Sequence, residues 1–297
     1  PKFFNYDKSN IENLCKKINI VCSVKNEIKY SFFPQPQLKI KNLVIKDFAD
    51  KKKEFAKIEN ANIKLSFYNL YNKQKFSYTK IELINARIDF NLSEFDKYKN
   101  FYQKENLLKP LDLKNGKINF YEDKKYIASI NNAEFKYRSK NVYDEINLKG
   151  EFLEDKISIN LKKEKEKLAT FIALKLLKSN LFAKINLFSK DKEKNVLSGD
   201  ILFKQNKNRL RGVFDYTDNK IILKKADLRN EFLKGKLSGD IAFLPYFYFN
   251  LDFDLNGLNF NKLSNILFIL DKNNKDTLYK ISNKINGQID ISTNKVY

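Results

Sequence analysis

Histidine, methionine and tryptophan are absent from this chain, and glycine, proline and cysteine are scarce, with eight, five and two residues respectively. Histidine is the usual proton shuttle at neutral pH and the commonest metal-binding side chain, so its absence excludes mechanisms that need an imidazole. The sequence also lacks metal-ligand spacing, a phosphate-cradling glycine loop and a nucleophile placed beside a base. We therefore expect a protein that is not an enzyme and uses no cofactor or metal.

Long apolar runs are lacking as well, since none approaches the roughly 20 residues that a membrane-spanning helix needs. The chain begins at Pro1 and not at methionine, so we expect a preceding segment that could carry a signal or a membrane anchor. Two cysteines, Cys15 and Cys22, are too few for a disulfide scaffold. They could form a bridge in an oxidising compartment or pack as two small apolar residues.

Acidic residues are outnumbered, with 36 Asp and Glu against 57 Lys and Arg and a net charge of +21. Such a balance attracts nucleic acid or anionic lipid headgroups. The lysines are nevertheless scattered, and they occur with many Asn, Ile and Phe residues, as an AT-rich coding bias would produce. Because a dedicated polyanion site should form a basic stripe or cluster, compositional bias is the favoured explanation.

What the sequence does contain is alternation of apolar and polar residues. The segments 27–33 and 38–45 alternate in this way and are joined across a turn with two prolines. Residues 247–255 place phenylalanine and leucine on one side and polar residues on the other. This period of two predicts strands with one apolar and one solvated face.

A short motif with a central glycine recurs along the chain and contains five of the eight glycines: Asn115-Gly116-Lys117-Ile118, Lys149-Gly150-Glu151-Phe152, Ser198-Gly199-Asp200-Ile201, Ser238-Gly239-Asp240-Ile241 and Asn286-Gly287-Gln288-Ile289. Glycine adopts backbone conformations that other residues resist, so we expect a bulge or bend at these positions. An elongated sheet grown from similar units follows.

Few helices are expected. Capping-box spacing at Ser9 and Glu12, followed by apolar residues at helical intervals, predicts one short helix near the N-terminus. Small helical insertions are expected around 93–102 and 261–270. The apolar segment 168–177 fits either a buried strand or a buried helix, and we favour a strand.

An apolar sheet face must be hidden from water, and these helices are too few to cover it. The sheet must therefore close into a barrel, pack on another sheet, or bend into a trough around an apolar ligand such as acyl chains. From the alternating apolar residues we predict that the following line the trough: Ile84, Ile88, Ile118, Phe120, Ile146, Leu148, Ile201, Phe203, Phe249, Leu251, Phe253, Ile289 and Ile291. Ordinary core packing is the alternative role for each of them.

The segment from Val24 to Ile45, with a strand, a proline turn and an alternating strand after a short helix, resembles the opening of AsmA-like proteins. The glycine-containing units downstream are similar to the extended body of that family. The resemblance implies a mainly β fold with a long, curved antiparallel sheet that forms an apolar groove, an AsmA-like N-terminal region over 1–110 and its continuation over 111–297. It also implies a periplasmic protein anchored to the inner membrane that handles phospholipid or another acyl-chain lipid in outer-membrane biogenesis.

Two other readings share some of these features. An outer-membrane β-barrel would have similar alternation, but lysines on both strand faces, as at Lys162-Lys163 and Lys224-Lys225, fit a lipid-facing surface poorly. A nucleic-acid binder would explain the charge and the alternation of aromatic residues with lysine, although ordinary strands produce the same pattern, so no nucleic-acid partner is expected. The carboxylates Asp200, Asp240, Asp252 and Asp254 are expected on the solvated face.

Overall fold

The computed structural model describes residues 7–17, 20–26, 28–47, 52–67, 78–95, 97–98, 110–122, 124–166, 169–191, 196–217, 220–242, 247–262 and 285–296. The chain divides into two compact units, Pro1–Asn160 and Leu161–Tyr297. The resemblance to AsmA-like proteins placed the end of the N-terminal region at residue 110, and this boundary stays a prediction.

The first unit consists mainly of long strands. They are β1 (Cys22–Val24), β2 (Ile28–Ser31), β3 (Gln37–Lys46), β4 (Glu54–Leu65), β5 (Tyr78–Asn91), β6 (Leu111–Glu122), β7 (Lys125–Ser139), β8 (Tyr143–Phe152) and β9 (Asp155–Glu164), which contains the unit boundary. Both β1 and β2 pair with β3. The successive pairs from β3 to β8 are antiparallel, apart from the parallel pair β5–β6.

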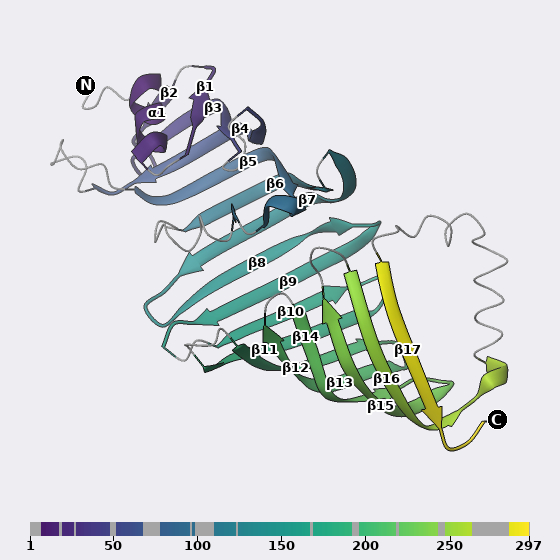
Figure 1. Cartoon of the computed structure of the whole chain (residues 1–297). Coiled ribbons are helices and arrows are strands. Elements are labelled where there is room, and N and C mark those ends of the chain that lie inside the picture. Colours follow the sequence, from purple (N-terminus) through teal and green to yellow (C-terminus); the bar gives the residue numbers. More distant parts are fainter. Residues whose placement is uncertain are drawn as a thin grey trace. The chain divides into compact units, whose positions relative to one another are not determined.

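The strands of the second unit are 7 to 12 residues long. They are β10 (Thr170–Leu176), β11 (Leu181–Asp191), β12 (Val196–Gln205), β13 (Asn208–Thr217), β14 (Lys220–Arg229), β15 (Leu233–Ala242), β16 (Phe247–Leu258) and β17 (Ile285–Thr293). Each pairs with the next in antiparallel fashion, apart from the parallel pair β16–β17. The strands of this unit curl, and in Figure 1 β16 and β17 stand in front of β10 to β12.

The predicted mainly β fold is confirmed. The strands form one mixed sheet of 17 strands that is not closed among the described residues. Two parallel pairs interrupt the antiparallel order that we expected, because alternation reveals the faces of a strand but not the direction of its neighbour. The predicted strands at 27–33, 38–45 and 168–177 correspond to β2, β3 and β10.

The predicted N-terminal helix is α1 (Lys8–Lys17), and it is fastened to β1. Cys15 and Cys22 form a disulfide with an S–S distance of 2.09 Å, which decides between the two roles considered for them. The backbone N–H of Val24 donates to the Glu12 carboxylate (3.4 Å), and the Lys8 ammonium donates to the Lys25 carbonyl (2.8 Å).

The two predicted helical insertions are only partly within the described residues. The first, expected around 93–102, overlaps the 3₁₀-helix η2 (Leu92–Glu94), which the Asn91 side chain caps by accepting from the Ser93 N–H (3.3 Å). Of the second, residues 261 and 262 are helical, and the remainder lies outside the described residues.

A line of asparagines crosses the first unit from β3 to β7. Asn42, Asn85, Asn115 and Asn132 have φ values of 54°, 53°, 51° and 49°. This is the left-handed region, which asparagine tolerates better than most residues other than glycine. On the polar face Asn115 Nδ2 donates to Asn85 Oδ1 (2.8 Å), and Asn85 Nδ2 donates to Glu59 Oε2 (2.8 Å).

This asparagine line shifts the side-chain alternation of the strands that it crosses. On β5, Leu83 is opposite the buried Leu113, and Ile88 is opposite the buried Ile118. Leu83 and Ile88 are an odd-numbered and an even-numbered residue of the same strand. In a regular strand, only the odd-numbered or only the even-numbered side chains point to a given face. The apolar face therefore passes from odd to even residues at Asn85.

Small residues occupy the apolar face at the level of the asparagine line, namely Ala86, Gly116, Ala133 and Gly150. A Cβ added at Gly116 would lie 2.6 Å from Leu113 Cδ2, and one added at Gly150 would lie 2.6 Å from Ile130 Cγ2. The apolar face is thus crowded at this level, which explains why an asparagine is repeatedly followed by alanine or glycine.

The glycines of the recurring motif have two roles. Gly116, Gly150 and Gly239 lie at or opposite shifts in strand register, as predicted, and Gly239 has a φ of 130°. Gly199 and Gly287 lie in regular ladders, where an added Cβ would lie 2.8 Å and 2.5 Å from the rings of the opposite phenylalanines. At these two positions glycine makes room for an aromatic ring.

Candidate functional site on the apolar face of the second unit

Rows of apolar side chains cross the second unit at right angles to its strands. Residues directly opposite each other in a sheet share a face, so the register defines each row. One row crosses all eight strands: Ile172, Ile185, Ile201, Gly212, Ala226, Leu237, Phe253 and Ile291. Its neighbour does the same: Thr170, Leu187, Gly199, Phe214, Leu223, Gly239, Leu251 and Ile289.

Two further rows lie on either side of these. One consists of Leu174, Ala183, Phe203, Leu210, Leu228, Gly235, Leu255 and Thr293. The other consists of Leu197, Tyr216, Ile221, Ile241, Phe249 and Gly287. Together the four rows make one face almost wholly apolar, and we call it the apolar face of the second unit.

Burial changes along this face. Phe214, Leu223 and Leu237 in its centre are only 3%, 5% and 6% exposed, and partly buried neighbours from β11 to β16 pack against them. On the last strand Ile289 and Ile291 are 51% and 56% exposed, although they belong to the same rows. The apolar surface therefore extends from a packed centre to an accessible rim.

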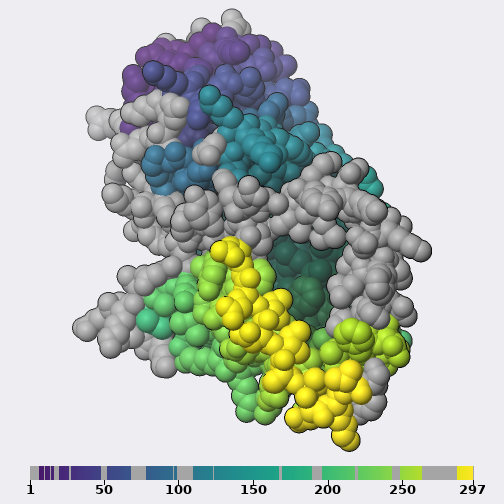
Figure 2. Space-filling model, turned by 45° about the vertical axis from the view of Figure 1, so that its right-hand side comes forward, coloured from purple at the N-terminus to yellow at the C-terminus, as the bar shows by residue number. Residues whose placement is uncertain are grey.

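The curl of the sheet hollows the second unit. Figure 2 shows a recess behind the yellow and light-green strands β16 and β17, and its floor has the darker green of earlier strands of the unit. A curled sheet with apolar residues across one face offers an elongated apolar surface to a ligand.

Seven residues of the predicted lining lie on this face: Ile201, Phe203, Phe249, Leu251, Phe253, Ile289 and Ile291. The structure brings them together with others that the sequence reasoning did not select: Ile185, Leu187, Leu210, Phe214, Leu223, Leu237 and Ile241. The missed residues also alternate with polar ones. Several stand opposite a motif glycine, as Phe214 stands opposite Gly199, and that pairing is visible only once the register is known.

The other predicted lining residues belong to the first unit. Ile88, Ile118 and Phe120 lie on its apolar face, where Ile118 is 7% exposed and the Phe120 ring stacks on Phe90 with centroids 6.2 Å apart. Ile146 and Leu148 pair with Tyr137 and Phe135 on the same face.

Ile84 departs from this pattern. The register places it opposite Asn60 and Lys114, on the polar face, because the left-handed Asn85 shifts the alternation between Ile84 and Ile88. The expectation that these two isoleucines share a face is therefore corrected.

The opposite face of the second unit is mainly polar, although Val213 and Ile222 are exposed on it. Lys224 pairs with Asp215 (2.6 Å), Lys220 pairs with Asp240 (3.0 Å), and Asn186 Nδ2 donates to Asp200 (2.9 Å). These contacts agree with the expectation that such carboxylates lie on the solvated side of their strands.

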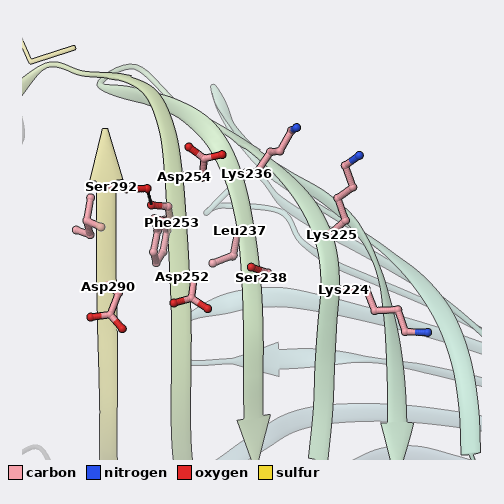
Figure 3. Close-up of a pocket in the computed structure, with 11 residues that line it drawn as sticks. Lys224, Lys225, Lys236, Leu237, Ser238, Asp252, Phe253, Asp254, Asp290 and Ser292 are labelled. Carbon is pink, nitrogen blue, oxygen red and sulfur yellow. Dashed lines mark hydrogen bonds between the residues drawn. The ribbon is translucent and has the colours of Figure 1, made fainter. Parts of the chain in front are cut away.

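A depression of about 520 Å³ lies over β14 to β17 and contains Asp252, Asp254 and Asp290 on one side (Figure 3). The side chains of Lys225 and Lys236 on its other side point away from the three carboxylates (Figure 3). The depression therefore separates charges of opposite sign without pairing them.

Within the described ranges, no three acidic or cysteine side chains are placed to hold a metal ion. In the same part of the chain, no helix has the length and apolarity needed to cross a membrane. The comparisons with protein-family models, curated proteins and solved structures give no match for this chain.

Proposed function

We propose that this chain is a non-enzymatic lipid-handling protein whose second unit binds phospholipid acyl chains along its apolar face. In this role it acts in the periplasm, anchored to the inner membrane, and conducts phospholipid between the inner and outer membranes during outer-membrane biogenesis. The resemblance to AsmA-like proteins agrees with this role, and the geometry of the face supports it independently.

The continuity of the apolar rows is the observation that carries the proposal. The row through Leu237 and Phe253 runs on to Ile291, which is 56% exposed. An acyl chain that enters at this rim could remain in contact with apolar side chains from one strand to the next. The glycines opposite Phe214 and Phe249 have no side chain, so the two rings can lie close to the backbone of the sheet. The rings therefore do not block the apolar surface.

The free energy at stake is large. Transfer of a methylene group from water to an apolar surface is worth about 0.8 kcal/mol, so two acyl tails exposed to water cost on the order of 20 kcal/mol. A continuous apolar face reduces this cost along the whole path. No covalent step and no cofactor is needed for such a role.

Recovery of lipid with the purified protein tests the proposal. We expect native mass spectrometry of the wild-type chain, produced in a bacterial host, to detect co-isolated phospholipid. Ile291→Lys places a charge on the apolar rim and should reduce the recovered lipid by about tenfold or more, since burial of an unpaired charge against acyl chains is costly. Phe253→Lys, closer to the packed centre, should reduce it at least as much.

Ile222→Lys is the matched control. Ile222 is 38% exposed and lies on the polar face opposite Asp215 and Asp240, where a lysine is easily accommodated. Circular dichroism of all three variants checks that the sheet is retained. If folded Ile291→Lys protein yields as much lipid as Ile222→Lys protein, the apolar face is not the binding surface and the proposal fails.

A further inference from the structure

Arginine is rare in this chain, and three of the arginines lie on one surface. Of the 57 basic residues only five are arginines, Arg87, Arg138, Arg209, Arg211 and Arg229. The first two lie in the first unit and pair with Asp89 (3.1 Å) and Asp112 (2.6 Å). The other three lie on the polar face of β13 and β14 in the second unit and have no ion-pair partner in the described part of that unit.

The strand register aligns two of these arginines with lysines. Lys204 on β12 is directly opposite Arg209, Arg209 is opposite Arg229, and Arg229 is opposite Lys234 on β15. We call these four residues the cationic row. Like charges directly opposite each other destabilise a sheet, and with strands about 4.8 Å apart the row is about 14 Å long.

The surroundings do little to neutralise this row. Glu231 lies in the turn between β14 and β15, but its carboxylate is engaged by Lys207 at 2.7 Å. Two carboxylates lie at the neighbouring level of the register: Asp227 stands between Arg211 and Lys236, and Asp254 follows opposite Lys236. The cations therefore outnumber the carboxylates at this surface.

A depression of about 300 Å³ accompanies the row. It is lined by Arg209, Arg211, Asp227, Leu228, Arg229, Lys234, Gly235, Lys236 and Asn256. The volume is sufficient for a phosphate group. Guanidinium groups bind phosphate oxygens in a bidentate manner, and lysines add point charges.

We propose that the cationic row is a docking site for the phosphate groups of an anionic phospholipid surface. Bound phosphates would lie between the four cations and remove their mutual repulsion. The row is longer than one phosphate, which favours a surface that presents several phosphates over a single free ion. No aromatic side chain is among the described residues that line the depression, so a nucleic acid would find no ring on which a base could stack.

The four cations are separate from the proposed acyl-chain surface, because they lie on the opposite face of the same strands; of the residues that line the depression, Leu228 and Gly235 belong to the apolar rows. The two proposals can therefore fail independently. Ile291→Lys should lower lipid recovery and leave vesicle binding intact, whereas substitutions in the cationic row should do the reverse.

Sedimentation with vesicles tests the docking site. The wild-type chain should bind phosphatidylglycerol vesicles and not phosphatidylcholine vesicles. Arg209→Gln combined with Arg229→Gln should weaken the binding by about thirtyfold, given that each cation near an anionic surface contributes roughly a factor of five. Arg209→Lys with Arg229→Lys keeps the charge and should restore most of the affinity.

The matched control is Lys114→Gln combined with Lys117→Gln, which removes two exposed strand cations from the polar face of the first unit. For this control we expect vesicle binding to change less than twofold. An equal loss of binding in the two double variants would show that the effect depends only on net charge, and it would overturn the site. Unchanged thermal unfolding of the arginine variant establishes that it folds.

Competition experiments with dissolved anions and with an oligonucleotide test whether the cationic row binds the phosphate groups of a lipid surface. Inorganic phosphate should release the protein from the vesicles more effectively than chloride at the same ionic strength. Equal release by chloride would overturn a specific phosphate site. Tighter binding of a single-stranded oligonucleotide than of the vesicles, with the same dependence on Arg209 and Arg229, would overturn the assignment to a lipid surface.

Discussion

Asp112 is the most strongly engaged carboxylate on the polar face of the first unit. It is 3% exposed, and its two oxygens lie 2.6 Å from Lys80 Nζ and 2.6 Å from Arg138 Nη1. Lys80 also contacts Glu82 at 2.9 Å, so the charges form a ladder across three strands. Burial alone would raise the pKa of Asp112, but the ion pairs with Arg138 and Lys80 outweigh it and hold the pKa below its ordinary value.

This pKa shift makes the stability of the first unit depend on pH. A carboxyl whose pKa is lower in the folded state stabilises the fold above its unfolded pKa of about 3.9, and this contribution is lost as pH falls through the folded pKa. We expect Asp112→Asn to lower the free energy of unfolding by about 1–3 kcal/mol at neutral pH. The difference from wild type should shrink as pH falls below 4.

Urea unfolding at pH 7 and at pH 3 measures both values. Asp254→Asn serves as the control, since Asp254 is exposed and no described residue forms an ion pair with it. A cost for Asp112→Asn that is as large at pH 3 as at pH 7 would contradict the role assigned to the ionised carboxylate.

At the scale of the strand, the asparagine line is the feature that shapes the first unit. Each left-handed asparagine changes which residues of its strand face inward, and the line links neighbouring strands through side-chain amides and Glu59. A β-branched residue would be strongly disfavoured in this backbone conformation. Glycine would tolerate it, at the loss of the side-chain hydrogen bonds.

We therefore expect Asn85→Val to lower the free energy of unfolding by about 2 kcal/mol or more. Asn85→Gly should cost less than about 1 kcal/mol. The control is Asn147→Val on β8, because Asn147 has no left-handed φ and valine suits a regular strand. Thermal unfolding of the three variants measures the order, and an equal cost for the two valine substitutions would contradict the proposed backbone strain.

The strands themselves show what the sequence can and cannot reveal. Alternation correctly predicted β2, β3 and the single apolar face of β16, and the apolar run at 168–177, for which we favoured a strand over a helix, contains β10. Alternation assigned Ile84 to the wrong face, because a pattern with a period of two does not reveal a left-handed residue in the middle of a strand. The repeated asparagine followed by alanine or glycine, at Asn85, Asn115 and Asn132, was the signal that could have located the shift.

Register is the information that a single strand lacks. The cationic row looked like scattered charge in the sequence, since Lys204 and Lys234 are thirty positions apart, and only pairing across β12 to β15 aligns them. The same holds for the apolar rows, in which Phe214 and Leu251 are brought together through Gly239 and Leu223.

At the scale of the whole molecule, charge is abundant and unevenly distributed. The chain carries a net charge of +21, yet β16 and β17 contain three aspartates and no lysine or arginine. Cations elsewhere, among them the cationic row, face one another without neutralisation. Self-repulsion of this kind destabilises a compact state, and dissolved salt weakens it.

We expect sodium chloride to stabilise the protein. Between about 0.01 M and 0.15 M salt the screening length falls from about 30 Å to about 8 Å, and relief of about 1 kcal/mol of repulsion would raise Tm by about 2–4 °C for a chain of this size. A variant with glutamine at all four positions of the cationic row should show a smaller rise, because part of the repulsion has been removed. Thermal unfolding in a buffer without phosphate measures both. A Tm that falls with salt in the wild-type chain would instead mean that attractive pairs such as Lys80 with Asp112 outweigh the net repulsion.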